Sequence, residues 1–476
     1  MVDHNIVLYP SPAIGHLIAM VELGKLILKH HPSFSITVLI TTPPYNTGST
    51  SPYINQISKS TPLIHFHHLP IVSLPSSNTP HIETLAFQLL ELNSPLVHQA
   101  LETISQSSTI RSFIIDAFCT AALEIGINLN IPTYYFYTSG ISVLANLLYF
   151  KTFAETETYI NGPDDPNMYL EFPGLPRISI RDMPKPMMDR TDKISEFVLN
   201  VSVNMPRSQG IIVNSFESFE SRALKVISDG CCVLDGPTPP IYAIGPLIAG
   251  GERSDGNGGH ECLSWLDSQP SQSVVFLCFG SLGLFSEAQL KEIAIGLEKS
   301  GQRFLWVVRS PPAEESKRFL APPEPDLDAL LPTGFLDRTK DRGLVVKSWA
   351  PQVEVLSHES VGGFVTHCGW NSVLEAVCAG VPMLAWPLYA EQKMNKVILV
   401  EEIKIALQLH ELDDGFVSAS ELETRVRELM DSNEGMTLSL RRRTERLSKE
   451  ANEAMSEGGS SIKALSELAK LWKVSC

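Results

Sequence analysis

The sequence lacks the features that mark several common protein classes. It contains no apolar run of 18 or more residues, so no membrane-spanning segment is predicted. Its first residues carry no basic leader and prolines interrupt the first apolar run, so no signal peptide is predicted. Lys and Arg number 37 against 53 Asp and Glu, which gives a formal net charge of −16. Because nucleic-acid binding needs a basic face, we expect no nucleic-acid partner.

Cysteine and glycine are present, but without the spacings that carry chemistry. The eight cysteines fit neither a metal-ligand pattern nor a disulfide framework, and several lie in apolar runs. Reduced thiols and a cytoplasmic protein are therefore expected. No G-x-G-x-x-G follows a strand-like run and no Walker-type loop occurs, which disfavours a dinucleotide-dependent dehydrogenase.

What the sequence does contain is length and a regular alternation of segments. A chain of 476 residues is too long for one hydrophobic core and favours two domains. Short apolar runs, such as 5–9, 34–41 and 112–116, alternate with segments of helical periodicity, which predicts α/β domains with parallel, doubly wound sheets. The glycine-rich stretch 250–261 is typical of a linker. We therefore expect a first domain over 1–249, a second over 262–455 and a C-terminal helix over 456–476.

The stretch 349–392 carries the strongest chemical signal; it reads WAPQVEVLSHESVGGFVTHCGWNSVLEAVCAGVPMLAWPLYAEQ. Within it, the apolar run 362–366 predicts a buried strand, residues 367–369 a turn, and the amphipathic segment that follows a helix ending at Gly380. A strand, a glycine-containing turn and a helix N-terminus bind phosphate through backbone N–H groups and the helix dipole. The stretch therefore predicts a phosphate-binding turn.

Side chains in the same stretch suit the rest of a nucleotide sugar. Further donors for phosphate, none with a fixed positive charge, are His367, Asn371 and Ser372. Glu375 lies one turn after Asn371 on the same helix face, where a carboxylate can accept hydrogen bonds from a ribose diol. Trp349 offers a flat face to a base, and Glu391 and Gln392 follow the next buried run, a position suited to sugar hydroxyls. Taken singly, such residues are as typical of a core or of an exposed helix charge; their combination favours a binding site.

This stretch resembles the 44-residue signature box of plant UDP-dependent glycosyltransferases of secondary metabolism. The match includes WAPQ at its start, the HCGWNS core, Glu375 and the closing EQ. The resemblance implies the GT-B architecture, two Rossmann-like domains facing across a cleft, with the last helix crossing back to the first domain. It also implies a transfer that inverts the anomeric carbon and needs no metal or other cofactor.

The resemblance further implies a role for each residue of the donor site. The base and ribose are held by Trp349, Ala350, Gln352 and Glu375. The diphosphate is held by Ser281, His367, Asn371 and Ser372. The sugar is held by Thr138, Trp370, Glu391 and Gln392. In this family a terminal glutamine accompanies glucose, so Trp370 and Gln392 predict UDP-glucose as the co-substrate.

Glycosyl transfer needs a base that removes the proton of the acceptor hydroxyl, and the ordinary pKa of histidine suits that task. His16 follows the first predicted strand and opens the first helix, and Asp116 ends the strand 112–116. Both positions lie at carboxyl ends of strands, where open α/β sheets bind ligands. A carboxylate bonded to His16 would fix its tautomer and stabilise the imidazolium. Singly, each residue is equally well explained as a helix-start or surface residue; the family pattern favours a His16–Asp116 dyad.

Candidates for the acceptor-binding surface are apolar residues beside His16. They are Ile14, Phe118, Met183 and Met187. The two methionines belong to a Pro- and Met-rich excursion over 161–190, which suits either a lip over an acceptor pocket or plain packing. The overall pattern resembles enzymes that act on flavonoids and chalcones, so we predict a monomeric enzyme that forms a β-O-glucoside of a small phenol. The alternatives are a C-glucosyltransferase, an O-glucosyltransferase of simple phenols or terpenoids, and an inactive nucleotide-sugar-binding protein.

One apparent metal motif does not support a metal site. Asp326-Leu327-Asp328 resembles the D-x-D motif of a different glycosyltransferase fold. It lies in the proline-rich insertion 310–332 rather than after a strand, so we interpret it as solvated charge and expect no bound metal.

Overall fold

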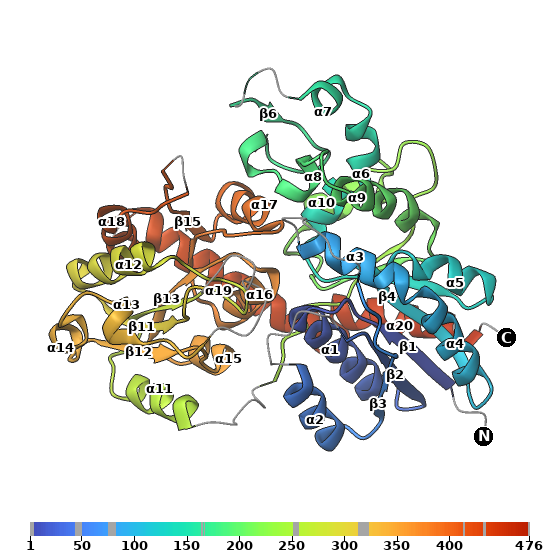
Figure 1. The fold of residues 1–476 in the computed structure, drawn as a ribbon, viewed down its shortest axis with the longest axis horizontal. Coiled ribbons are helices and arrows are strands. Elements are labelled where there is room, and N and C mark those ends of the chain that lie inside the picture. Colours follow the sequence, from blue (N-terminus) through green and yellow to red (C-terminus); the bar gives the residue numbers. More distant parts are fainter. Residues whose placement is uncertain are drawn as a thin grey trace. The chain divides into compact units, whose positions relative to one another are not determined.

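A computed structural model describes residues 4–42, 50–74, 82–162, 165, 167–250, 257–312, 323–412, 415–431 and 435–474 (Figure 1). The chain divides into two compact units. Unit 1 is Met1–Ile248 with Glu453–Cys476, and unit 2 is Ala249–Asn452. Each unit is built on a parallel sheet flanked by helices, which confirms the predicted α/β class with two parallel sheets.

In the described residues, the main sheet of unit 1 has seven parallel strands. In spatial order they are β3 (Ile64–His68), β2 (Phe34–Ile40), β1 (His4–Tyr9), β4 (Thr109–Asp116), β5 (Thr133–Tyr137), β8 (Ile211–Val213) and β9 (Ile241–Ala243). The order reverses direction at β1, next to β4, and such a switch point is where open α/β sheets form ligand sites. β1, β4 and β5 are therefore the strands whose carboxyl ends position the predicted dyad.

The helices of unit 1 follow the strand–helix alternation of the sequence. They are α1 (Ile14–His30), α2 (Thr50–Ser60), α3 (Ile82–Leu92), α4 (Ser94–Ser105), α5 (Ala122–Asn128), α6 (Ile141–Ala154), α7 (Glu157–Asn161), α8 (Lys185–Met188), α9 (Ile194–Asn204), α10 (Ser221–Ser228) and α20 (Ser460–Val474). Pro95 lies in the first turn of α4. Proline is tolerated there because the first N–H groups of a helix have no partner within the helix.

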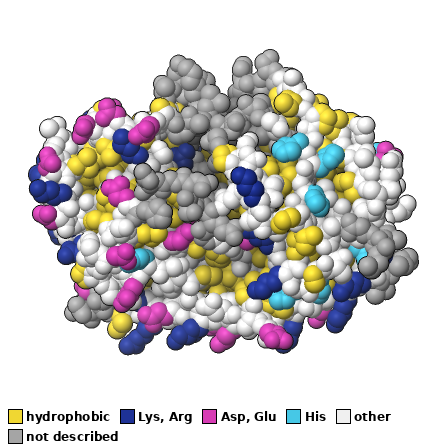
Figure 2. All heavy atoms as spheres, turned by 90° about the horizontal axis from the view of Figure 1, so that it is seen from below, with side chains coloured by type: hydrophobic (Ala, Val, Ile, Leu, Met, Phe, Trp, Pro, Cys, Tyr) yellow, Lys and Arg dark blue, Asp and Glu magenta, His cyan; other side chains and the backbone are white. Residues whose placement is uncertain are grey.

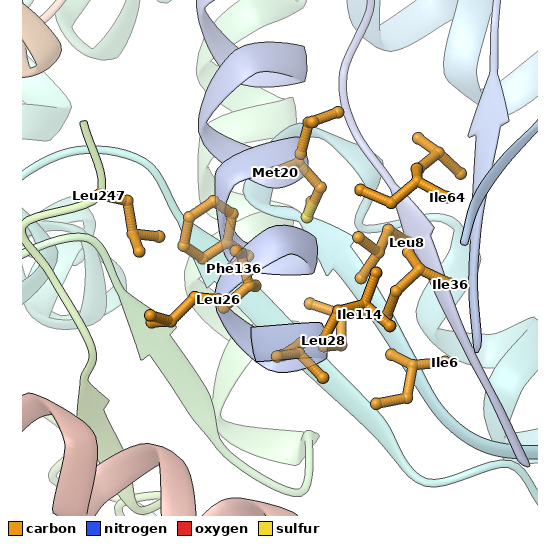
Figure 3. Packing of buried hydrophobic residues seen from close by; sticks show 14 of the residues in the cluster. Ile6, Leu8, Met20, Leu26, Leu28, Ile36, Ile64, Ile114, Phe136 and Leu247 are labelled. Atoms are coloured by element: carbon orange, nitrogen blue, oxygen red, sulfur yellow. The ribbon is translucent and has the colours of Figure 1, made fainter. Parts of the chain in front are cut away.

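The core of unit 1 lies between α1, the sheet and the C-terminal helix. Figure 3 shows Met20 and Leu26 of α1 among strand residues such as Leu8, Ile36 and Ile114. The cluster also includes residues of α20, which Figure 1 draws in red beside the strands of this unit. The α20 residue Trp472 makes edge contacts with Phe34 and Tyr134, with ring centroids 6.0 and 6.2 Å apart. The last helix is thus part of the hydrophobic core of unit 1.

In the described residues of unit 2, the sheet has six parallel strands. In spatial order they are β12 (Gly343–Lys347), β11 (Arg303–Val308), β10 (Val274–Cys278), β13 (Val361–Thr366), β14 (Met383–Ala385) and β15 (Ala406–Gln408). The helices are α11 (Asn257–Asp267), α12 (Glu287–Ser300), α13 (Leu327–Leu330), α14 (Phe335–Thr339), α15 (Gln352–Leu356), α16 (Trp370–Ala379), α17 (Gln392–Val397), the π-helix η5 (Ile398–Glu402), α18 (Ala419–Met430) and α19 (Gly435–Met455). The end of α19 is counted with unit 1.

The structure adds detail to three segments that the sequence singled out. The expected linker 250–261 ends early, because α11 already begins at Asn257; residues 251–256 lie outside the described residues. The glycines of this stretch suggested irregular chain, but Cys262 and Leu266 of α11 are fully buried, and that burial stabilises the helix. Asp326 and Asp328, interpreted as solvated charge, are both exposed, and Asp326 in addition accepts a hydrogen bond from the Ala329 N–H and caps α13. The excursion 161–190 contains a small antiparallel pair, β6 (Tyr169–Leu170) with β7 (Ile178–Ser179).

Candidate active site

The part of the site in unit 1 is assembled at the carboxyl ends of three neighbouring strands. His16 lies in the first turn of α1, which follows β1; Asp116 is the last residue of β4; and Thr138 directly follows β5. Because parallel strands end at the same edge of their sheet, these three residues meet in space although His16 is 100 positions from Asp116 and 122 from Thr138.

His16 and Asp116 form the hydrogen-bonded pair that the sequence predicted. His16 Nδ1 lies 2.7 Å from Asp116 Oδ2. The Asp116 side chain is 1% exposed, whereas that of His16 is 27% exposed. The second carboxylate oxygen, Oδ1, accepts a hydrogen bond from the Phe118 N–H at 2.9 Å. The carboxylate is thus held from the protein side, and the imidazole that it orients remains accessible to solvent.

Thr138 contacts the same imidazole nitrogen. Its Oγ1 lies 3.1 Å from His16 Nδ1. The family resemblance gave Thr138 a contact with the sugar; the structure adds a contact with the dyad that the sequence did not suggest. Thr138 precedes α6, whose first two N–H groups, at Ile141 and Ser142, donate to the buried Glu220 carboxylate at 2.8 and 2.9 Å. Glu220 therefore fixes the start of the helix that follows Thr138, a role no sequence pattern indicated.

The apolar acceptor candidates occupy different environments. Phe118 makes an edge contact with the His16 ring at 5.4 Å between centroids and stacks on Phe87 at 4.9 Å. Ile14 is the first residue of α1 and packs against the core of unit 1. Met183 and Met187 are 2% and 6% exposed, which favours packing for these two; their contact with an acceptor stays a prediction. Phe118 is the candidate that the structure brings to the dyad.

The part of the site in unit 2 is built on turns with unusual backbone geometry. After β10, β12, β13 and β14, respectively, a positive φ occurs at Gly280, Ser348, Cys368 and Ala390. For a residue with a Cβ this conformation is sparsely populated and is maintained only where surrounding contacts impose it. Strained residues of this kind cluster at functional sites, and here they lie at the sheet edge where the predicted donor residues are found.

His367 lies between two of these turns. A Cβ at Gly280 or at Gly369 would overlap the imidazole at Nε2, so both positions require glycine. This packing places Ser281, an exposed residue, beside the turn of His367. The ring is buried, and its burial lowers the pKa of His367 to about 4. His367 is therefore neutral near pH 7, as expected for a side chain that donates a hydrogen bond to the diphosphate without adding a fixed charge.

Three of the predicted donor-site residues are joined by hydrogen bonds between α15 and α16. Gln352 Nε2 donates to Ser372 Oγ at 2.8 Å and to Glu375 Oε2 at 2.6 Å. The nearby Trp349 is 38% exposed, unlike a core tryptophan, while Ala350 is buried. The sharp bend at Ser348 turns Trp349 out of the strand direction. An exposed indole beside an amide–carboxylate pair suits a base and a ribose diol.

The start of α16 combines backbone and side-chain groups. Its N-cap is Gly369, which has no side chain to cap the first turn. The first N–H groups of a helix have no acceptor within the helix, which makes a helix start a common site for an anion. Trp370 and Ser372 are buried in this turn and Asn371 is partly exposed. The sequence prediction of a strand, a turn and a helix N-terminus at this point is confirmed.

Glu391 and Gln392 begin α17, next to the turn of His367. The side-chain carbonyl oxygen of Gln392, Oε1, accepts hydrogen bonds from the backbone N–H groups of Leu388 and Tyr389 at 2.9 and 3.0 Å. Glu391 Oε1 lies 3.4 Å from Asn395 Nδ2. Tyr389 also lies against the His367 ring, with centroids 6.0 Å apart. The structure thus brings the predicted sugar-binding residues next to the predicted diphosphate turn.

Four further observations concern the described residues as a whole. Within the part of the chain that the structure covers, no three His, Cys, Asp or Glu side chains could together hold a metal ion. None of the helices described is long and apolar enough to cross a membrane. The described cysteines are all free thiols; Cys476 lies outside the described residues. On the face drawn in Figure 2, basic side chains lie among acidic ones.

Comparison with known proteins identifies the family. The sequence model described as UDP-glucoronosyl and UDP-glucosyl transferase matches residues 224–443. The anthocyanidin 5,3-O-glucosyltransferase of a Rosa hybrid cultivar is 52% identical over 481 residues, which cover 98% of each chain. The phloretin 2'-O-glucosyltransferase of Pyrus communis is 51% identical over 473 residues, which cover 97% of this chain and 98% of that protein. This chain belongs to the UDP-glycosyltransferase family.

A solved structure supports the same assignment. Phytolacca americana UGT2 complexed with UDP-2fluoro-glucose and pterostilbene is 37% identical, with a TM-score of 0.87, over 98% of this chain and 99% of that chain. The similarity confirms the GT-B fold and the class of UDP-dependent glycosyltransferase that the signature box predicted.

Proposed function

We propose that this UDP-glycosyltransferase transfers glucose from UDP-glucose to a hydroxyl of a small phenolic acceptor and forms a β-O-glucoside. The observation that carries the proposal is the 2.7 Å contact between His16 Nδ1 and Asp116 Oδ2, with the histidine partly exposed and the aspartate buried. A histidine held in this way at the ligand edge of a parallel sheet suits a general base.

In the proposed mechanism His16 removes the acceptor proton. Because Nδ1 faces Asp116, the second ring nitrogen, Nε2, takes the proton from the acceptor hydroxyl. The oxygen then attacks the anomeric carbon, the bond from that carbon to UDP breaks, and the configuration inverts from α to β. Asp116 stabilises the imidazolium that forms, without being protonated itself.

The proposed donor site lies in unit 2. Trp349 stacks on the uracil, Ala350 and Gln352 hold the base and ribose, and Glu375 accepts from the ribose hydroxyls. The diphosphate is bound by Ser281, His367, Asn371, Ser372 and the first N–H groups of α16. Trp370, Glu391 and Gln392 bind the glucose, together with Thr138 of unit 1. These directed donors stabilise the UDP leaving group, so the reaction needs no metal ion.

The proposed acceptor site lies in unit 1, where Phe118 and Ile14 supply apolar contacts near His16 and Met183 and Met187 complete the surface. The two relatives are named for anthocyanidin and phloretin, and the solved relative is complexed with pterostilbene; all three compounds are aromatic phenols. This common chemistry supports flavonoids and chalcones as the acceptor class. A monomeric state, cytoplasmic location and the domain bounds 1–249, 262–455 and 456–476 remain part of the proposal.

A product assay tests the proposal. The protein is incubated with UDP-glucose and a panel of a flavonol, a flavone, a chalcone, an anthocyanidin, a simple phenol and a terpenoid alcohol, and products are identified by mass and acid stability. We expect hexosides of the polyphenols that acid hydrolyses. Acid-stable hexosides would replace the proposal with C-glucosyl transfer. Products only from the simple phenol or the terpenoid would overturn the acceptor class, and no product at all would overturn the transfer itself.

A further inference from the structure

Asn395 of α17 contacts both the turn before α16 and the carboxylate of Glu391. The side chain is fully buried, at 0% exposure. Its Nδ2 donates to the Cys368 carbonyl oxygen at 3.0 Å and lies 3.4 Å from Glu391 Oε1. Since both neighbours are acceptors, the assignment of the amide nitrogen to this side is determined by its surroundings. No sequence motif singled out this residue.

The contact with Cys368 bears on the proposed diphosphate turn. Cys368 has φ +64°, an unfavourable conformation for a residue with a Cβ, so the turn depends on contacts that hold it. In a trans peptide the C=O and the N–H point in opposite directions. A bond that fixes the Cys368 carbonyl therefore also fixes the direction of the Gly369 N–H, at the N-cap of α16.

The contact with Glu391 bears on the proposed sugar site. Glu391 is the N-cap of α17 and follows Ala390, which has φ +50°. Asn395 is one turn further along the same helix, and its backbone N–H donates to the Glu391 carbonyl at 3.0 Å. The side-chain amide can therefore orient the carboxylate from a position that is already fixed by the helix.

We infer that Asn395 is a positioning residue that couples the diphosphate-binding turn to the sugar-binding carboxylate of Glu391. The inference rests on the proposed function, which gives these two elements their ligands. Asn395 is fully buried and is itself no ligand. It holds the Cys368–Gly369 peptide and the Glu391 carboxylate in one arrangement, so that diphosphate and sugar are bound together.

Asn395→Leu is the informative substitution, because leucine has the same branched shape, although a larger volume, and cannot donate. It leaves the Cys368 carbonyl buried without its donor and removes the contact that orients Glu391. Asn93→Leu is a matched control in unit 1: Asn93 is also buried, and its Nδ2 donates to the Leu89 carbonyl at 2.7 Å. Both variants lose one buried amide-to-carbonyl bond, so both should lose thermal stability.

The readouts are the Kd values for UDP and UDP-glucose, kcat, the KM for UDP-glucose and the melting temperature. For Asn395→Leu we expect the KM for UDP-glucose to rise about tenfold and kcat to fall, with UDP-glucose binding weakened more than UDP binding. Asn93→Leu should keep the KM for UDP-glucose within twofold at a similar loss of melting temperature. If Asn395→Leu gives the same Kd values for UDP and UDP-glucose, the same kcat and the same KM for UDP-glucose as Asn93→Leu, the inference is wrong.

Two further measurements keep the test decisive. If Asn395→Leu does not fold, Asn395→Ser is tested instead; serine is smaller but keeps a hydrogen-bond donor, so the KM for UDP-glucose should rise by less. An unchanged KM and unchanged Kd for UDP-glucose would again overturn the inference. In a Glu391→Ala background, Asn395→Leu should weaken UDP-glucose binding less than in the parent, because the two residues act together. Should the parent protein fail to transfer glucose, the proposed function fails, while the two Kd values still decide the part played by Asn395.

Discussion

Asp116 Oδ2 lies 2.7 Å from His16 Nδ1, although the two residues are 100 positions apart in the chain. The pair depends on the register of β1 against β4, in which Tyr9 is opposite Ile115, so that both strands end at the same level of the sheet. The Phe118 N–H holds the other carboxylate oxygen. The dyad is therefore positioned by the sheet and by a backbone contact, not by flexible loops alone.

Substitution of either member of this dyad should remove catalysis and leave donor binding intact. General base catalysis contributes about 10²–10⁴-fold, so His16→Ala should lower kcat by that order. Asp116→Asn keeps the shape but removes the negative charge that stabilises the imidazolium, so a large loss of kcat is expected as well. Calorimetric titration should give a Kd for UDP close to that of the parent. Activity of His16→Ala within a few-fold of the parent would exclude His16 as the base.

Substitution of Thr138 should lower kcat less than substitution of Asp116. Its hydroxyl oxygen lies 3.1 Å from the same His16 nitrogen but carries no charge, and Asp116 remains in Thr138→Val. We expect kcat to fall by less than about tenfold, consistent with loss of one neutral hydrogen bond. Thr138→Ser, which retains the hydroxyl, is the control and should be close to the parent. A Thr138→Val loss as large as that of Asp116→Asn would mean that Thr138 contributes more than one neutral hydrogen bond and would contradict this prediction.

The sequence was sufficient for the elements that rest on local patterns. Strands buried in a parallel sheet read as continuous apolar runs, which is why β1, β2, β4 and β13 could be predicted. The end of α16 at Gly380, with φ +71°, follows from the C-cap preference for glycine. The short strand β15 was missed because three residues carry too little pattern.

The site itself could be predicted in identity but not in its supporting contacts. The signature box and the family pattern supplied the donor residues and the dyad. Glu220 and Asn395 could not be found, because their partners are fixed by tertiary structure: Glu220 reaches the start of α6, 79 positions away, and Asn395 reaches Cys368, 27 positions away. Strain at Cys368 is also invisible in the sequence, since cysteine has no special preference for positive φ.

Activity should persist after chelation of divalent metal ions. In the proposed mechanism the charge on the leaving diphosphate is stabilised by the first N–H groups of α16 and by side-chain donors such as Ser372. We expect the initial rate with UDP-glucose in excess EDTA to equal that without EDTA. A control with Mg²⁺ added back should also leave it unchanged. A rate lost in EDTA and restored by Mg²⁺ or Mn²⁺ would show that a metal takes part.

Burial of His367 makes the stability of unit 2 depend on pH. Because the pKa of His367 is lowered from 6.5 to about 4, the unfolded chain binds a proton that the folded protein does not over that range. Stability from this group is therefore complete above pH 6.5 and is lost as the pH falls towards 4, with a loss of about 1–2 kcal/mol between pH 7.5 and pH 5.5.

Comparison of variants isolates this contribution. The melting temperature of His367→Gln, measured without UDP, should fall less between pH 7.5 and pH 5.5 than that of the parent, by a few degrees. His410→Gln is the control, because His410 lies in the same unit but is exposed. An equal pH dependence in the parent and in His367→Gln would contradict the assignment.

Gln392 should bind the glucose only through the N–H groups of its side-chain amide. Its carbonyl oxygen already accepts from the N–H groups of Leu388 and Tyr389, at 2.9 and 3.0 Å. Gln392→Glu keeps an acceptor for both, so the loop and UDP binding should survive, while the KM for UDP-glucose rises about tenfold or more because the donor group is lost. Gln392→Leu removes the acceptor too and leaves two N–H groups unpaired, at about 1–3 kcal/mol each, so it should also lower the melting temperature. If Gln392→Glu retains the KM and kcat of the parent, the amide N–H groups do not bind the glucose.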